Sequence, residues 1–181
     1  MEKALQTKVA DVVRNRAVVP LHVSILTAAG FDADRSVTDY EGVDWGLEER
    51  GDLVEASVYR HVPLKYLVAD DVNLLLLWGS TAEPLVEVAL HYLKQNPFAA
   101  TNGLTYSAML ANVAEALCPA AEGPRNATPV DRTYSDRLAA VCAGARAMIA
   151  DGRVGDAAAD LYQDPEAMVR DVEARLGLGP G

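Results

Sequence analysis

The spacing of apolar residues is the feature that most limits how this chain of 181 residues can fold. Apolar side chains recur three or four positions apart in most segments, as at Leu85, Val88, Ala89, Tyr92 and Leu93. This period places them along one face of an α-helix. No segment alternates apolar and polar residues over the length of a strand, and no unit repeats at a fixed period. The sequence therefore predicts an all-α protein, a single irregular domain of about seven to nine short helices.

Capping residues mark where several of the predicted helices begin and end. Pro20 and Gly30 bound one of them, because proline suits the first turn of a helix and glycine suits the left-handed position after the last turn. An aspartate that precedes a proline, at Asp164, indicates the start of the last helix. Residues 31–46 follow neither the helical nor the strand period and contain many turn formers. We therefore predict a long surface loop there.

A run of apolar residues at 72–78 follows two adjacent carboxylates, Asp70 and Asp71. One of these carboxylates is expected to accept hydrogen bonds from the free amides of a first helical turn. The alternative is a metal site, which needs several converging oxygen ligands, and no spaced partner is evident nearby. A helix that is apolar almost all round belongs inside a domain. Ser80 and Glu83 then have the spacing of a capping box at the start of the next helix.

Prolines and a glycine interrupt the helical pattern at residues 119–133, which we interpret as a Pro-rich loop. This loop divides the chain into a helical core at residues 1–118 and C-terminal helices at residues 134–181. A chain of this length usually forms one hydrophobic core. The C-terminal helices are therefore expected to pack on the same domain as the helical core.

The overall charge is strongly negative and narrows the possible function classes. The formal net charge is −10 and the sequence pI is about 4.7. Binding to phosphate backbones or anionic lipid surfaces is therefore not expected. The longest apolar run is far too short to span a membrane, and the N-terminus lacks the apolar core of a signal peptide. We predict a cytoplasmic protein with no nucleic-acid or membrane partner, and its alanine and arginine content is typical of bacteria.

No motif of an established catalytic or cofactor site occurs in the chain. The histidines His22, His61 and His91 do not stand at metal-binding spacing from other ligand types. The glycine-rich phosphate-binding patterns, the HExxH zinc pattern and the GxSxG nucleophile pattern are all absent. Cys118 and Cys142 form no paired motif, which favours reduced structural thiols. We therefore predict no catalytic residue, no metal site and no cofactor.

Negative charge is concentrated in one segment of the chain. Residues 32–55 carry nine carboxylates and only two basic residues, Arg35 and Arg50. Tyr40 and Trp45 stand among these acids, and large rings on loops commonly anchor protein interfaces. Negative potential beside such rings would steer a basic partner and then hold it. The alternative is a solubilising loop whose Trp45 folds back onto the core.

We interpret the chain as a non-enzymatic protein that binds a basic protein partner through residues 38–52. A toxin-neutralising immunity protein, a secretion adaptor or chaperone, and a small subunit of a larger complex all fit this chemistry. The sequence does not predict an oligomeric state. The residues predicted to contact the partner are Asp39, Tyr40, Glu41, Asp44, Trp45, Glu48, Glu49 and Asp52.

A second hypothesis rests on residues 48–62, EERGDLVEASVYRHV. Glu49 and Asp52 form an E-x-x-D pair, which on a helix places both carboxylates on one face where they could share a magnesium ion. This stretch resembles the second half of the motif of MazG-like nucleotide pyrophosphohydrolases, which implies an all-α enzyme that hydrolyses nucleoside triphosphates with magnesium. The E-x-x-E pair that begins that motif has no counterpart, since residues 20–39 contain no glutamate. The resemblance assigns metal and phosphates to Glu48, Glu49, Asp52 and Glu55.

Overall fold

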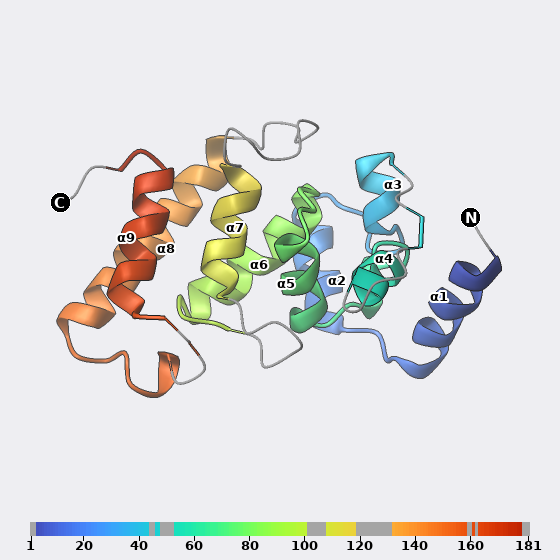
Figure 1. Ribbon diagram of the computed structural model, residues 1–181, viewed down its shortest axis with the longest axis horizontal. Helices are drawn as coiled ribbons and strands as arrows, with labels where there is room; N and C mark the ends of the chain where they lie inside the picture. Colours follow the sequence, from blue (N-terminus) through green and yellow to red (C-terminus); the bar gives the residue numbers. More distant parts are fainter. Residues whose placement is uncertain are drawn as a thin grey trace. The chain divides into compact units, whose positions relative to one another are not determined.

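The computed structural model describes residues 3–43, 46–47, 53–100, 108–118, 132–158, 161 and 163–178. Over these residues it contains nine α-helices, two short 3-10 helices and no strand (Figure 1), which confirms the predicted all-α fold. Among the described helices, none has both the length and the apolar character to span a lipid bilayer. The elements are α1 (Lys3–Asn15), α2 (Pro20–Ala28), α3 (Val37–Glu41), α4 (Leu53–Tyr59), η1 (Leu64–Tyr66), α5 (Ala69–Leu77), α6 (Glu83–Gln95), α7 (Met109–Leu117), α8 (Arg132–Ala150), η2 (Asp156–Ala158) and α9 (Pro165–Arg175).

Contacts between residues divide the chain into two compact units, residues 1–88 and residues 89–181. The boundary falls inside α6, so this helix contributes residues to both units. The division predicted at residues 119–133 stays a prediction, because residues 119–131 lie outside the described part of the chain. Both α8 and α9 contact α7. Helices that precede and follow the Pro-rich stretch therefore pack together in the second unit.

The helix α5 lies in the core of the first unit. All of its residues from 71 to 76 are buried, as expected for a helix that is apolar almost all round. Asp71 is the third residue of α5 and not the residue that precedes it. Its carboxylate accepts a hydrogen bond from the amide of Val68 over 2.8 Å and forms an ion pair with Arg16. The carboxylate thus serves the helix start, and it also ties α5 to the segment that joins α1 to α2.

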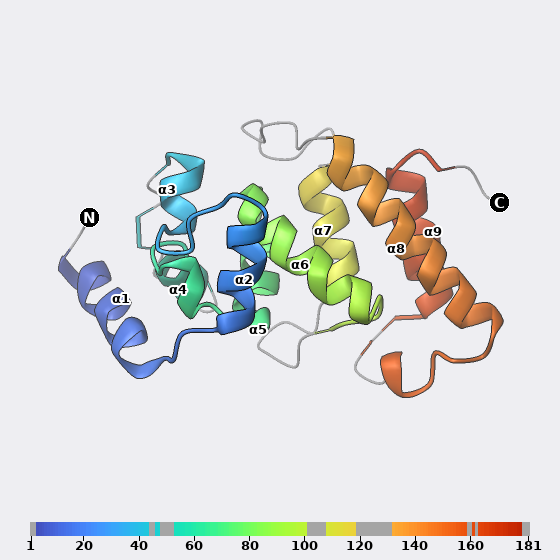
Figure 2. The same ribbon diagram turned by 180° about the vertical axis from the view of Figure 1, so that it is seen from behind.

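The second unit is built on the packing of α9 against α8 and α7. The view from behind shows α8 with α9 next to it (Figure 2). An ion pair between Arg146 of α8 and Glu173 of α9 supports this contact and lowers the pKa of the Glu173 carboxyl. The buried residues that the two helices contribute are Tyr134, Leu138, Val141, Cys142, Ala145, Met168, Val169 and Val172.

Two of the predicted helix starts are confirmed. Pro20 is the first residue of α2, and Gly30 follows that helix with a left-handed φ of +83°. Asp164 caps α9, since its carboxylate accepts a hydrogen bond from the amide of Ala167 over 2.8 Å. Local capping chemistry therefore determines these boundaries.

Two other local predictions are wrong. The capping box predicted from Ser80 does not form, because α6 begins only at Glu83 and the Ser80 hydroxyl donates to Glu41 instead. The stretch at 31–46, predicted to be a loop throughout, contains the short helix α3. The Ser80 hydroxyl binds a residue that is distant in the sequence, and α3 begins at a capping box of its own.

The two cysteines are free thiols in different surroundings. Cys142 is buried in α8, and burial raises the pKa of its thiol to about 11. Cys118 is half-buried and directly follows α7. Since the thiolate is the reactive form, both the burial of Cys142 and its raised pKa disfavour reaction of this thiol in the folded protein.

Candidate functional site

The candidate site is the part of the acidic region that the structure describes as continuous chain, residues 31–43, called here the α3 segment. Its helix forms because Ser36 and Asp39 make a capping box: the Ser36 amide donates to the Asp39 carboxylate over 2.7 Å, and the Asp39 amide donates to the Ser36 hydroxyl over 3.3 Å. The hydrogen bond from the Ser36 amide, together with one that the Ser36 hydroxyl donates to the same carboxylate, lowers the pKa of Asp39. Gly42, with φ of +67°, ends the helix.

Backbone hydrogen bonds fix the α3 segment to residues 60–65. The amide of Thr38 donates to the carbonyl of Arg60 over 2.9 Å, and the amide of Leu64 donates to the carbonyl of Arg35 over 3.0 Å. An antiparallel bridge between Ser36 and Pro63 lies between these contacts. The segment is therefore held in one conformation by the chain that follows α4, although only five of its residues are helical.

Tyr40 lies against its own segment and is partly exposed. Its hydroxyl donates to the carbonyl of Asp32 over 3.0 Å and accepts the amide of the same residue over 2.8 Å. The ring meets Phe31 edge-on, with 5.8 Å between centroids, and the Arg35 guanidinium lies 4.3 Å from the ring centroid. Tyr40 thus closes the segment into a compact unit and remains partly exposed.

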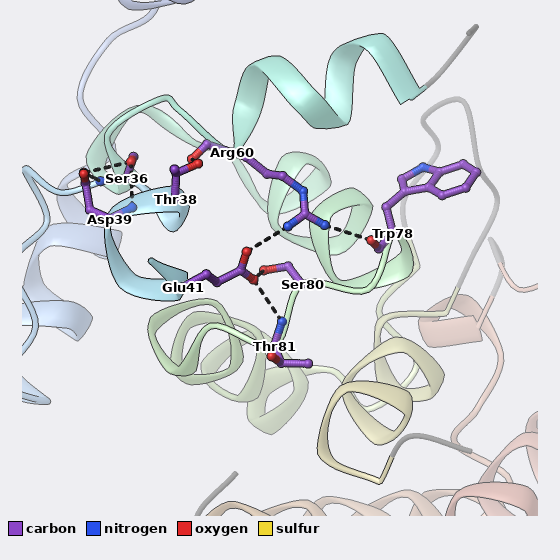
Figure 3. Close-up of polar contacts among 8 residues, drawn as sticks. All are labelled: Ser36, Thr38, Asp39, Glu41, Arg60, Trp78, Ser80 and Thr81. Carbon is purple, nitrogen blue, oxygen red and sulfur yellow. Dashed lines mark hydrogen bonds and ion pairs between the residues drawn. The ribbon is translucent and has the colours of Figure 1, made fainter. Parts of the chain in front are cut away.

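Glu41 points inward and forms a buried ion pair with Arg60 over 2.8 Å (Figure 3). The side chains of Glu41 and Arg60 are 12% and 7% exposed. Burial lowers the pKa of the Arg60 guanidinium, and the neighbouring carboxylate opposes that shift. Glu41 was predicted to contact a partner, and in the folded chain its carboxylate is directed to the interior.

The same ion pair reaches the turn between α5 and α6. The Glu41 carboxylate accepts hydrogen bonds from the Ser80 hydroxyl and from the Thr81 amide, the latter over 3.2 Å. On its other side Arg60 donates to the carbonyl of Trp78 over 2.9 Å. Figure 3 shows Arg60 between Glu41 and that carbonyl, with the Trp78 ring directed away from the pair. One buried network therefore joins α3 to the end of α4 and to this turn.

Basic residues of the segment itself and of residues 60–65 lie beside the acids of the α3 segment. Lys65 forms an ion pair with Asp34, whose side chain is 71% exposed. Arg35 donates to the carbonyl of Asp39. The local charge count in the sequence therefore overstates the negative potential of this segment. The exposed acids of the segment are Asp32, Asp34 and Asp39, and Asp34 among them is paired with Lys65.

The structure describes four of the nine residues predicted by the two hypotheses. Asp39, Tyr40 and Glu41 belong to α3, where the first two border the solvent and the third is directed inward. Glu55, the last residue of the alternative hydrolase set, is exposed on α4. The other predicted residues, Asp44, Trp45, Glu48, Glu49 and Asp52, lie outside the described residues.

Sequence reasoning missed the residues that position the α3 segment. Arg60 and Lys65 lie 19 or more positions from their partners in the chain, and the pairs form only in the fold. The S-x-x-D pattern of Ser36 and Asp39 was the one local signal that could have revealed α3. Within the part of the chain that the structure describes, no group of three or more His, Cys, Asp and Glu side chains could hold a metal ion.

No protein-family model, no curated protein and no solved structure matches this chain. Function is therefore inferred from the geometry of the α3 segment and from its charge.

Proposed function

We propose that this chain is a cytoplasmic protein that binds a basic protein partner through the α3 segment, and that it acts by binding and not by catalysis. The supporting observation is the fixed backbone of an exposed acidic segment, which hydrogen-bonds to residues 60–65. An immunity protein that neutralises a basic toxin, a secretion adaptor or chaperone, and a small subunit of a complex are the classes that this proposal covers.

A fixed segment favours binding because little conformational entropy is lost when the partner arrives. The capping box of α3 and the contacts of Tyr40 with Phe31 and Asp32 hold the segment before any partner binds. The exposed side chains can then meet a complementary surface without rearrangement of the backbone. Rigid presentation of this kind supports a role in binding over a merely solubilising role.

Charge and apolar surface occur together on the segment. Asp34 and Asp39 are exposed, Tyr40 is partly exposed, and Val43 is 42% exposed directly after the helix. Carboxylates at the rim of an interface raise the rate at which a basic partner associates, while apolar and aromatic groups slow its dissociation. The acids at 44–52 extend the negative charge along the sequence. The partner is therefore expected to present lysine or arginine side chains around an apolar patch.

A double variant that reverses one charge and replaces one apolar side chain tests the proposal. Asp34→Lys with Val43→Asp changes two exposed positions of the α3 segment, and its effect should be a loss of at least tenfold in affinity for the partner that co-purifies with the tagged wild-type chain. Glu166→Lys with Leu178→Asp makes the same charge changes at exposed positions of the second unit and serves as the control. Affinity is measured by calorimetry with the purified partner, at low and high salt.

The control variant should retain wild-type affinity, and both variants should keep the wild-type melting temperature. Equal affinity of the two variants for the partner, with both folded, would show that the α3 segment is not the binding surface. A partner whose affinity does not fall with salt would contradict the predicted role of charge.

A further inference from the structure

A second surface of the first unit is covered by α1, which lies beside α4 in both ribbon views (Figures 1 and 2). Leu5 is the only fully buried residue of α1 in the described chain. Val9, Val12 and Val13, which complete its apolar stripe, remain partly exposed. The helix is therefore attached to the rest of the unit by a small apolar contact.

No polar interaction of α1 reaches another element among the described residues. The Thr7 hydroxyl donates to the carbonyl of Lys3, Arg14 pairs with Asp11, and the Asn15 amide group donates to the carbonyl of Asp11, so each of these contacts closes within the helix. Apolar contacts have no preferred direction, unlike hydrogen bonds. Among the described residues, α1 is therefore held to the unit by apolar contact, which does not require one particular sequence.

The chain is fastened again directly after α1, at Arg16. Its guanidinium pairs with Asp71, donates to the Tyr59 hydroxyl over 3.0 Å and lies 4.8 Å from the centre of that ring. Residues that follow Arg16 are held by this anchor and by the hydrogen bond from the Val19 amide to the Lys65 carbonyl. Detachment of α1 would therefore stop at residue 16 and leave the remainder of the first unit in place.

The charge of α1 is opposite to that of the protein. Its residues 3–15 contain three basic residues and one aspartate, while the whole chain has a formal net charge of −10. The single charged residue of α4 is Glu55, which is exposed. A basic amphipathic helix is thus the kind of helix that already sits on α4, and the acidic body of the protein attracts helices of that charge.

We propose that the face of α4 under α1 is a docking surface for a basic amphipathic helix of a partner protein, which binds by displacing α1. Recognition of this kind lays the apolar face of a helix on an apolar surface, with anchors three and four residues apart. In the free protein α1 occupies the surface and protects it from other contacts. This proposal concerns a different surface from the α3 segment and holds or fails independently of it.

Peptide binding to the full-length chain tests the proposal. The probes are a fluorescent peptide of residues 1–17 and a designed helical peptide with the same apolar spacing and lysine at its polar positions. Leu5→Asp should detach α1 and free the surface. Fluorescence anisotropy should then show that both peptides bind this variant at least tenfold more tightly than the wild type. A version of the designed peptide with glutamate in place of lysine should bind at least tenfold more weakly.

Three results would overturn the proposal. The first is a folded Leu5→Asp chain that binds neither basic peptide more tightly than the wild type. The second, which applies even if that variant does not fold, is amide hydrogen exchange of wild-type α1 that occurs only through global unfolding. The third is a concentration-dependent dimer that the residue 1–17 peptide dissociates, because it would assign the surface to α1 of a second copy.

Discussion

Residues 1–88 and residues 89–181 are both helical, but their polar side chains are placed differently. Eight polar or charged residues are buried in the described chain, and Asn112 is the only one of them in the second unit. The two most buried ion pairs among the described residues also lie in the first unit: Glu41 and Arg60 are 12% and 7% exposed, and Asp71 and Arg16 are 6% and 25% exposed, whereas Glu115 and Arg175 of the second unit are 46% and 44% exposed. The buried polar residues of the first unit are His22, Ser36, Ser57, Arg60, Asp71, Asn73 and Ser80.

The lengths of the helices explain this difference. In the first unit, α3 and α4 have five and seven residues, so neither has an apolar stripe long enough to determine its position by packing. Buried hydrogen bonds and ion pairs, which are directional, supply the missing specificity. In the second unit, α8 has 19 residues and packs against α9 along a continuous apolar face. Apolar contacts are sufficient there, and the ion pairs can remain near the surface.

The largest expected effect comes from removing the buried carboxylate of the first unit. Glu41→Ala leaves the Arg60 guanidinium buried without that counter-ion, which should lower the free energy of unfolding by about 4 kcal/mol. Both tryptophans, Trp45 and Trp78, lie in the first unit, so denaturation followed by tryptophan fluorescence reports on this unit.

A double variant provides the control for this prediction. Replacing both partners, with Glu41→Leu and Arg60→Met, removes the buried charges together and should recover part of the lost stability, because an apolar pair of similar size avoids the cost of burying charge. The recovery should be incomplete, since the Ser80 hydroxyl and the Trp78 carbonyl lose these hydrogen-bond partners. A loss smaller than about 1 kcal/mol for Glu41→Ala alone would show that this ion pair behaves like one at the surface.

The second unit should be sensitive to apolar truncation instead. Leu138 of α8 is fully buried, and Leu138→Ala should lower the free energy of unfolding of this unit by about 3 kcal/mol through lost burial and the cavity left behind. Helical circular dichroism should record the change, while the tryptophan fluorescence transition should stay near its wild-type midpoint. A shift of both signals by the same amount would mean that the two units unfold as one.

A smaller, pH-dependent effect is expected at the capping box of α3. The pKa of Asp39 is lowered in the folded chain, chiefly by the hydrogen bond from the Ser36 amide. Its contribution, about 1 kcal/mol, is therefore present above the unfolded pKa of about 4 and is lost as the pH falls through the lower folded pKa. Asp39→Ala should be less stable than the wild type at pH 7 and equally stable at about pH 2. A difference that persists unchanged in acid would exclude the carboxylate as its source.

The smallest effect is expected for an exposed ion pair of the second unit. Arg175→Ala removes the partner of Glu115, and both side chains are nearly half exposed. Urea denaturation should show a change of about 0.5 kcal/mol or less. A loss approaching that of Glu41→Ala would remove the contrast between the two units.

The sequence predicted the features that depend on local chemistry. The all-α class, the start of α2 at Pro20, the cap of α9 at Asp164 and the buried core of α5 all follow from spacing and from residue type. Each depends on interactions between residues a few positions apart, which helical geometry fixes in advance.

The features that the sequence could not predict depend on distant pairs. Ser80 matched the pattern of a capping box, but Glu41 is 39 positions away and binds its hydroxyl in the fold. Asp71 is paired with Arg16 from a distance of 55 positions. The charge of the candidate site was overstated for the same reason, because Lys65 reaches Asp34 only after folding. The roles of Asp39 and Tyr40 in partner binding remain predictions, and the structure adds their fixed local geometry.

The contrast between the two thiols gives the second unit a reporter of its own. A thiol-reactive dye applied at pH 8 should attach to Cys118 in the native protein, while Cys142, still protonated and enclosed by α8 and its neighbours, should react only after the unit opens. The rate at which the second equivalent of dye is consumed therefore measures how often residues 89–181 open. Together with the fluorescence of the two tryptophans of the first unit, this reaction allows the opening rate of each unit to be measured separately without a single substitution.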